Sequence, residues 1–282
     1  MKIITEKRCI IGESPVWNEN EKLLYITNGM EKEICIIDVK TGELKVRPTD
    51  KGVCAIAFTE NDKVIVSSYD GVFILNNDNT ATELYDTDKY KIQYANDMKV
   101  GPDGAIYVGT MSLKRKGISE EIDGKLYRID KNGNVNILLD NLILSNGLEW
   151  SVNEKYFYHT DSDTNTIKEY NFDKLSGNIS YTGRSIKIIG IDGFTIDENN
   201  NLFVACWGQG HIAIVDTKEM KIKDYIKIPA KIPASCSFCG ENMDTLAIAT
   251  ANYNCDLSVD KNAGYPILLK TQTKGRKPYL FG

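Results

Sequence analysis

The chain lacks the features that mark several large protein classes. It has no long run of lysine or arginine, and its formal net charge is −5, so nucleic acid is not an expected partner. Its longest apolar stretches, such as residues 202–207, are only as long as a strand, and residues 1–6 become charged too early for a signal peptide. We therefore expect a soluble, cytoplasmic protein that does not bind membranes.

Histidine is scarce, and one common hydrolase motif is absent. Only His159 and His211 occur, and the chain contains no Gly-x-Ser-x-Gly elbow. A histidine-ligated zinc site and a Ser-His-Asp triad therefore have no support. We expect His159 to have a packing or supporting role. The segment at 208–210 is a glycine-rich strand turn and not a phosphate loop, because no helix follows it.

The seven cysteines are an odd number and are scattered along the chain. This pattern favours reduced, buried thiols over a disulfide framework. Cys236 and Cys239 form a C-x-x-C motif, which is also typical of zinc and redox sites. No second pair stands at zinc-ligand spacing and no βαβ pattern surrounds the motif, so we interpret both residues as structural.

Internal repetition is the most informative feature of the sequence. The 282 residues, with 42% hydrophobic and 26% charged side chains, have the composition of a globular protein. Six segments share one template, in which a small or polar residue leads, apolar residues follow two and four positions later, and a turn rich in Asn, Asp, Glu and Gly precedes an apolar strand. The leading residues, 41 to 50 positions apart, are Glu13, Cys54, Asn96, Asn146, Asp192 and Ala234.

This repeat predicts an all-β fold. Each segment reads as a β-hairpin, and a third strand follows at residues 34–37, 71–74, 125–128, 167–170, 211–214 and 265–268. A period of roughly 40 to 50 residues suits a four-stranded blade. We predict one domain, residues 1–282, folded as a six-bladed β-propeller of four-stranded antiparallel blades. Segments 2–5 and 277–281 are expected to close the ring. A β-sandwich is the alternative.

The leading positions also predict a site. Pseudo-symmetry would bring them together at one mouth of the propeller, and four of the six carry side-chain oxygens, namely Glu13, Asn96, Asn146 and Asp192. Carboxylate and amide oxygens are the ligands that hard cations prefer. Buried carboxylates that converge without a cation would repel one another. Taken one at a time, these residues could equally be solvated turn residues.

Several segments also resemble the signature stretches of a known family. They are residues 12–17, 96–97 with 101–104, 145–148, 160–162, 192–197 and 262–265. Together they are similar to the senescence-marker/gluconolactonase-like (regucalcin-type) family over roughly residues 10 to 282. The resemblance implies that Glu13, Asn146 and Asp192 bind one divalent cation, usually taken as calcium, and that Asn96 lies beside the metal and the substrate. Oxygen ligands leave Mg, Mn or Zn open as well.

From this site we predict metal-dependent hydrolysis of a small lactone or ester. The cation would polarise the carbonyl, with Asp192 as the base that activates water and Asn96 orienting the substrate. Sugar-lactone members of the family carry an arginine where this chain has Tyr94, so a smaller or less polar substrate is expected. Glu120 is a further candidate for substrate contact from the mouth loop.

Two other functions fit the same sequence. The propeller could be a calcium-binding scaffold without turnover, because a fold does not determine an activity. It could also be a phosphotriester-type hydrolase with the same kind of metal centre.

Overall fold

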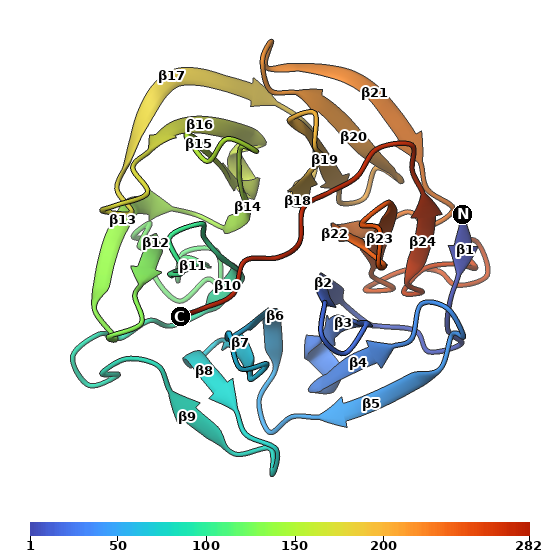
Figure 1. Cartoon of the computed structure of the whole chain (residues 1–282), viewed down its shortest axis with the longest axis horizontal. Coiled ribbons are helices and arrows are strands. Elements are labelled where there is room, and N and C mark those ends of the chain that lie inside the picture. The colour runs from blue at the N-terminus through green and yellow to red at the C-terminus, as the bar shows by residue number, and fades with distance from the viewer. The chain divides into compact units, whose positions relative to one another are not determined.

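The structure, a computed structural model, describes all 282 residues. It contains six antiparallel sheets of four strands each and only two short 3-10 turns, η1 (Gly29–Glu31) and η2 (Ser162–Thr164). Figure 1 shows these sheets as successive sets of arrows along the chain. The chain is therefore a six-bladed β-propeller, and the predicted fold class is confirmed. None of its helical segments has the length and apolar character needed to cross a bilayer.

Two compact units contain three blades each, and each blade takes the name of its first strand. The first unit consists of Met1–Val53 and Ile188–Pro278. Its strands are β1 (Lys2–Ile3), β2 (Gly12–Asn18), β3 (Leu23–Asn28), β4 (Glu33–Ile37), β5 (Leu44–Pro48), β18 (Ile191–Ile196), β19 (Asn201–Cys206), β20 (His211–Asp216), β21 (Lys221–Lys227), β22 (Pro233–Cys239), β23 (Thr245–Thr250) and β24 (Ile267–Lys270). Within this unit, β22 contacts both β2 and β18.

The second unit consists of Cys54–Lys187 and Tyr279–Gly282. Its strands are β6 (Val53–Phe58), β7 (Val64–Ser68), β8 (Gly71–Leu75), β9 (Ala81–Glu83), β10 (Ala95–Val100), β11 (Ile106–Thr110), β12 (Gly124–Ile129), β13 (Val135–Leu142), β14 (Ser145–Trp150), β15 (Tyr156–Asp161), β16 (Thr166–Phe172) and β17 (Ile179–Lys187). Here β10 contacts both β7 and β14. All six third strands overlap the predicted segments.

A left-handed residue lies in the turn between the first and second strands of every blade. These residues, with φ between 52° and 73°, are Lys22, Asp62, Gly104, Glu154, Asn200 and Met243. In five of the six turns the N–H of this residue donates to the carbonyl three residues earlier, which closes a tight hairpin turn. Only one of these six residues is glycine. The six blades therefore share the backbone geometry of this turn but not the residue type.

Each unit has its own buried core. In the first unit, Trp17, Phe203 and Phe238 belong to one cluster. In the second unit, Tyr107 and Trp150 pack edge to face with ring centroids 4.8 Å apart, and Phe157 lies 5.0 Å from Trp150. Aromatic pairs at such distances stabilise a core beyond the area they bury. These side chains come from inward-facing template positions, so the apolar spacing in the sequence predicts the core.

The two ends of the chain differ from the predicted ring closure in one respect. Strand β1 pairs with β24 through Lys2 and Ile3, so the outer strand of the β22 blade comes from the N-terminus, as predicted. The prediction that residues 277–281 also take part in this closure is wrong. Phe281 instead forms a parallel bridge with Thr59 in the second unit. Pro278 lacks a backbone N–H and cannot donate to a strand ladder, which explains why the segment runs as an irregular tail.

The cysteines are free thiols in the structure. In the C-x-x-C motif, the Cys236 thiol donates to the Phe203 carbonyl at 3.1 Å. Burial raises the pKa of the Cys239 thiol to about 12. Cys239 therefore lacks the thiolate character of a redox or metal-binding cysteine, and Cys236 is engaged as a buried hydrogen-bond donor.

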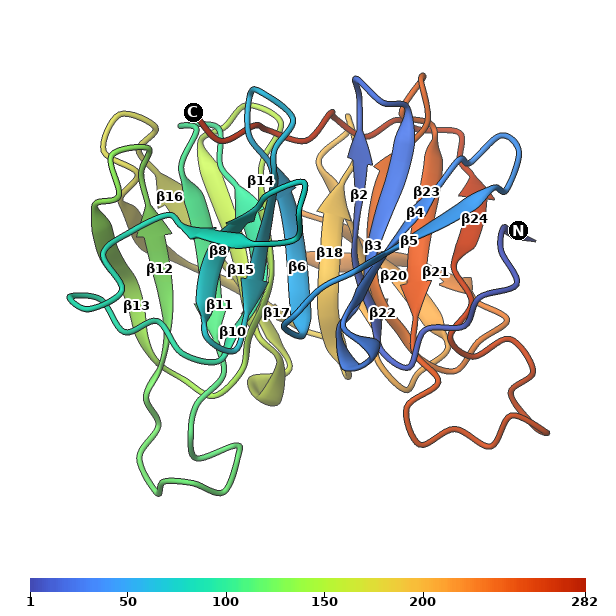
Figure 2. The ribbon, with the colours of Figure 1, turned by 90° about the horizontal axis from the view of Figure 1, so that it is seen from below.

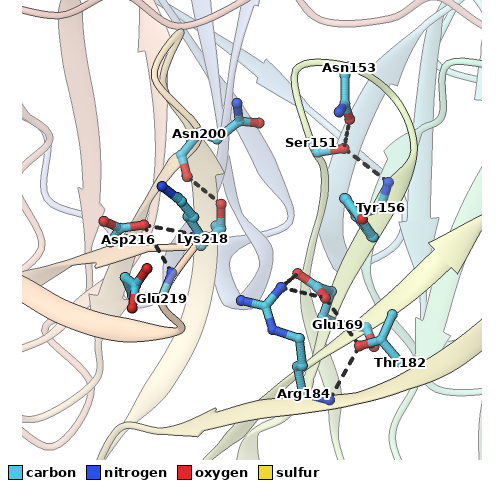
Figure 3. A network of polar contacts seen from close by, with 11 residues as sticks. Ser151, Asn153, Tyr156, Glu169, Thr182, Arg184, Asn200, Asp216, Lys218 and Glu219 are labelled. Carbon is cyan, nitrogen blue, oxygen red and sulfur yellow. Dashed lines mark hydrogen bonds and ion pairs between the residues drawn. The ribbon is translucent and has the colours of Figure 1, made fainter.

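Polar contacts tie the outer strands to their blades. Figure 3 shows one example in the second unit, where the Arg184 guanidinium reaches both oxygens of the buried Glu169 at 2.9 Å. The Thr182 hydroxyl also donates to Glu169, at 3.1 Å. In the first unit, the Asp216 carboxylate accepts from the Lys218 N–H at 2.8 Å in the turn after β20. These bonds stabilise β17 and the β20–β21 hairpin without contributing to the candidate site.

Candidate functional site

A β-bulge interrupts five of the six first strands near the leading position of the repeat. In the first unit, the register shifts between Glu13 and Val16, between Ile191 and Phe194, and between Pro233 and Ser235. In the second unit, it shifts between Ala95 and Met98 and between Asn146 and Leu148. A bulge re-aims side chains and is common beside active sites. All four leading residues with oxygen-bearing side chains lie in or at such a bulge.

The first unit holds the two carboxylates of the predicted site. Glu13 is half-buried on β2, and its carbonyl accepts from the Thr27 hydroxyl at 3.1 Å. The next residue, Ser14, has a φ of 47°, which is unusual for a residue with a side chain. Asp192 is 5% exposed on β18. Glu13 and Asp192 thus lie near the starts of the two strands that flank β22.

Close packing fixes the backbone beside Asp192. A Cβ on Gly193 would lie 2.3 Å from the Ser235 hydroxyl oxygen of the neighbouring β22 strand. No real side chain fits at that distance, so this position requires glycine. The close approach of β18 to β22 therefore depends on the residue that follows the buried carboxylate.

The second unit holds the two amides. Asn96 and Asn146 are buried at the starts of β10 and β14. The Asn96 side-chain amide donates one N–H to the Ser145 carbonyl at 3.1 Å, a bond that does not use the amide oxygen. The Ser67 hydroxyl donates to the Asn96 carbonyl at 2.6 Å. Asn96 is therefore held at both its main chain and its side chain, and one of these bonds links it directly to the neighbour of Asn146.

A buried histidine supports this pair from the next strand. His159 on β15 is 2% exposed, and its Nε2 lies 2.7 Å from the Ser145 hydroxyl. Burial, with a smaller effect from the charge of Lys168, lowers the pKa of His159 to about 3. The ring is thus neutral at physiological pH, and its contact with Ser145 fits the supporting role expected from the sequence.

The two predicted substrate residues of the second unit lie in different surroundings. Tyr94 is half-buried two residues before Asn96 and has a left-handed φ of 53°. Its ring lies 5.4 Å from that of Tyr69. Glu120 is exposed in the segment between β11 and β12. The structure thus joins Tyr94 to a defined cluster, whereas Glu120 stays apart from the hydrogen bonds around Asn96.

Three charged residues of β10 and β14 lie beside the two asparagines but were not among the site residues predicted from the sequence. Asp97 and Glu149 are buried, and the Lys99 ammonium lies 2.9 Å from a Glu149 oxygen. Burial raises the pKa of Asp97, and the charge of Glu149 raises it further, against the opposing effect of Lys99. The sequence feature that could have identified them is a charged residue within a first strand that is otherwise apolar. This ion pair joins neighbouring blades beside the two asparagines.

The residue types of the predicted ligands suit a hard divalent cation. The structure contains no group of three or more His, Cys, Asp and Glu side chains that could hold a metal ion, and the predicted ligands combine carboxylates with amide oxygens. In the first unit Glu13 and Asp192 carry carboxylates, and in the second unit Asn96 and Asn146 carry amides. Such oxygens bind calcium or magnesium and do not favour soft metals.

Comparison with known proteins now identifies the family. A family model described as the SMP-30/Gluconolactonase/LRE-like region matches residues 11–252. The chain belongs to this family. The matched region contains all four leading residues with side-chain oxygens, and the resemblance inferred from the sequence motifs is confirmed.

Individual relatives cover almost the whole chain. The putative sugar lactone lactonase YvrE of Bacillus subtilis is 30% identical over 252 residues, which are 87% of this chain and 85% of that protein. Regucalcin of Gallus gallus is 27% identical and covers 100% of this chain, with 98% of its own length matched. The crystal structure of a calcium-binding protein, regucalcin, from Agrobacterium tumefaciens superposes with a TM-score of 0.88 at 22% identity, covering 99% of this chain and 96% of that one. This last match supports the fold.

Proposed function

We propose that this protein hydrolyses a small lactone or ester with the help of one divalent cation, expected to be calcium, held by Glu13, Asn146 and Asp192. The observation that carries this proposal is the repeated bulge, which holds a carboxylate or an amide at the leading position of four blades. Membership of a family that includes a putative sugar lactone lactonase supports the choice of reaction.

The residues of the chain have separate tasks in this reaction. Asp192 accepts a proton from the attacking water as the water oxygen bonds to the carbonyl carbon. The bond between that carbon and the ring oxygen then breaks, and the ring oxygen takes up the proton that Asp192 accepted, which gives a hydroxy acid and restores the Asp192 carboxylate. Asn96 holds the substrate through its side-chain amide, which has one N–H bonded to the Ser145 carbonyl and keeps its oxygen and second N–H. Glu13 and Asn146 serve as ligands. When bound, the cation supplies Lewis-acid stabilisation of the developing oxyanion.

Two substitutions separate the ligand role from the base role. Asp192→Asn keeps an oxygen ligand but removes the base, so kcat should fall by about 100-fold or more even at calcium concentrations that saturate the site. Glu13→Gln removes one charge from the ligand set and should weaken calcium binding by roughly tenfold or more. Calorimetry measures the metal affinity. Turnover is measured on aldonolactones, aromatic lactones and phosphotriesters with Ca, Mg, Mn or Zn, each against a chelator.

Glu43→Gln is the matched control, because Glu43 is exposed and lies away from the first strands. Full activity in Asp192→Asn would contradict the assignment of the base. A wild-type protein that binds calcium but turns over no substrate in this panel would favour the second candidate, a non-catalytic calcium-binding propeller. That candidate draws support from a structural relative described as a calcium-binding protein.

A further inference from the structure

Two tyrosines and a lysine form a cluster at the edge of the second unit that also contains Asn96. The Lys116 ammonium lies 4.5 Å from the centre of the Tyr69 ring and 5.8 Å from that of Tyr94. It also lies 3.3 Å from the Tyr69 hydroxyl. The two rings are 5.4 Å apart and inclined by 51°. A cation over two aromatic faces is attracted by both, so the three side chains form one group, the Tyr-Tyr-Lys cluster.

The cluster and Asn96 occupy the same end of their blades. Tyr69 follows the last residue of β7, Tyr94 precedes β10, and Lys116 lies in the segment that follows β11. In an antiparallel blade, the start of the first strand and the end of the second strand meet at one edge. Figure 2 shows the segment between β11 and β12 as a green loop that extends beyond these strands.

Backbone bonds hold the cluster in place. The Tyr94 N–H donates to the Tyr69 carbonyl at 2.7 Å, and the Tyr94 carbonyl accepts from the Met111 N–H at 2.9 Å. Tyr94 adopts this arrangement with a φ of 53°, a conformation that is costly for a residue with a Cβ and that concentrates at functional sites. The Asp123 carboxylate accepts from the Leu113 N–H at 2.8 Å and anchors the loop that carries Lys116.

Lys116 differs from its neighbour in having no anionic partner. Arg115 is paired with Asp163 at 3.0 Å, whereas the contacts of Lys116 are the tyrosines. An exposed ammonium is a compact point charge with three donors, and it favours a full negative charge over a neutral hydroxyl. The rings beneath it offer flat apolar surface to the carbon skeleton of a ligand.

We propose that the Tyr-Tyr-Lys cluster determines substrate specificity, and that the substrate is a lactone or ester bearing a carboxylate group. Lys116 pairs with this carboxylate while Tyr69 and Tyr94 contact the adjoining carbon atoms. The reacting carbonyl then lies toward Asn96, two residues from Tyr94 in the chain. This inference rests on the proposed function, because it concerns the substrate of the same site. It replaces the less polar substrate expected from Tyr94 alone, because Lys116 adds a positive charge beside that ring.

The test compares two lactones with the same ring, one carrying a free carboxylate and one carrying its methyl ester. Wild type is expected to prefer the carboxylate form. Lys116→Met should lower kcat/KM for that form about tenfold and change it less than twofold for the methyl ester. Added salt should weaken only the reaction of the carboxylate form. Lys131→Met, which removes an exposed lysine from the β12–β13 turn, is the matched control and should behave as wild type.

Failure of hydrolysis and failure of this inference can be told apart. If wild type hydrolyses neither lactone, the corresponding lactams, which resist hydrolysis, are titrated by calorimetry in the presence of calcium. Tighter binding of the carboxylate lactam, lost in Lys116→Met, would support the specificity cluster even without turnover. Equal losses for both compounds in Lys116→Met, or a wild-type preference for the methyl ester in either assay, would overturn it.

Discussion

His159 should make the stability of the protein depend on pH. Its ring is 2% exposed, and burial lowers its pKa to about 3 from the ordinary value of 6.5. The unfolded chain therefore binds a proton in a pH range in which the folded chain does not. The stability that the neutral ring provides is complete above pH 6.5 and declines as the pH falls toward 3. Asp97 titrates in the opposite sense, because its pKa is raised, so the effect of His159 has to be isolated by substitution.

The size of the effect follows from the difference between the two pKa values. One pH unit in this window corresponds to about 1.4 kcal/mol for a single group. Most of the interval between pH 7 and pH 5 lies below pH 6.5. The free energy of unfolding of wild type should therefore fall by about 2 kcal/mol over this interval through His159 alone. His159→Gln removes the titrating group and offers an amide to the Ser145 hydroxyl.

The assay is the free energy of unfolding in urea, measured at half-unit steps from pH 7 to pH 5. The wild-type curve should fall more steeply than the His159→Gln curve, with the two differing in slope by about 1 kcal/mol per pH unit on average over this range. Parallel curves for wild type and His159→Gln would refute the assignment of a buried neutral ring.

Two further substitutions test the packing around the site and the outer strands. A Cβ on Gly109 would lie 2.0 Å from the Ser145 hydroxyl oxygen, so Gly109→Ala should lower the free energy of unfolding by about 1 to 3 kcal/mol in urea titrations. An unchanged value would mean that β14 moves away freely. Arg184→Met should cost about 2 kcal/mol or more, because it leaves the buried Glu169 without its cation. Lys174→Met, which breaks an exposed pair, should cost less than about 0.5 kcal/mol in the same assay, and equal costs for the two would contradict the role of burial.

The repeat in the sequence predicts the blades because apolar residues two apart must face the same side of a strand. It therefore yields all six hairpins and the third strands. It does not predict the bulges, because a bulge is an extra residue in one strand and has no residue type of its own. Nor does it reveal the partners of buried charges. Lys99 pairs with Glu149 from a strand 50 positions later, and a single sequence does not show that β10 and β14 are neighbours at this register.

The residue types of the candidate site could be predicted from the sequence. The residues that hold the site in place by hydrogen bonds could not. The other two segments begin with a small residue, Cys54 or Ala234. Four segments begin instead with a residue whose side chain carries oxygen, namely Glu13, Asn96, Asn146 or Asp192, and this difference makes them stand out. Ser145 has no such signal, yet its carbonyl and hydroxyl bond to Asn96 and His159. Its role depends on distances between strands, which only the folded chain defines. The shared binding of one cation by Glu13, Asn146 and Asp192 remains a prediction for the metal titrations.

The β22 blade indicates how chemistry and scaffold are divided in this fold. Its first strand has the same bulge as β2 and β18, but the leading residue is Ala234, which is fully buried and carries no ligand atom. The bulge therefore does not require a functional side chain, and the fold tolerates an apolar residue in its place. Lys116, by contrast, lies on an exposed loop outside the strands. Substitutions there should alter substrate preference with little change in stability, whereas substitutions at the bulges should alter catalysis for every substrate alike.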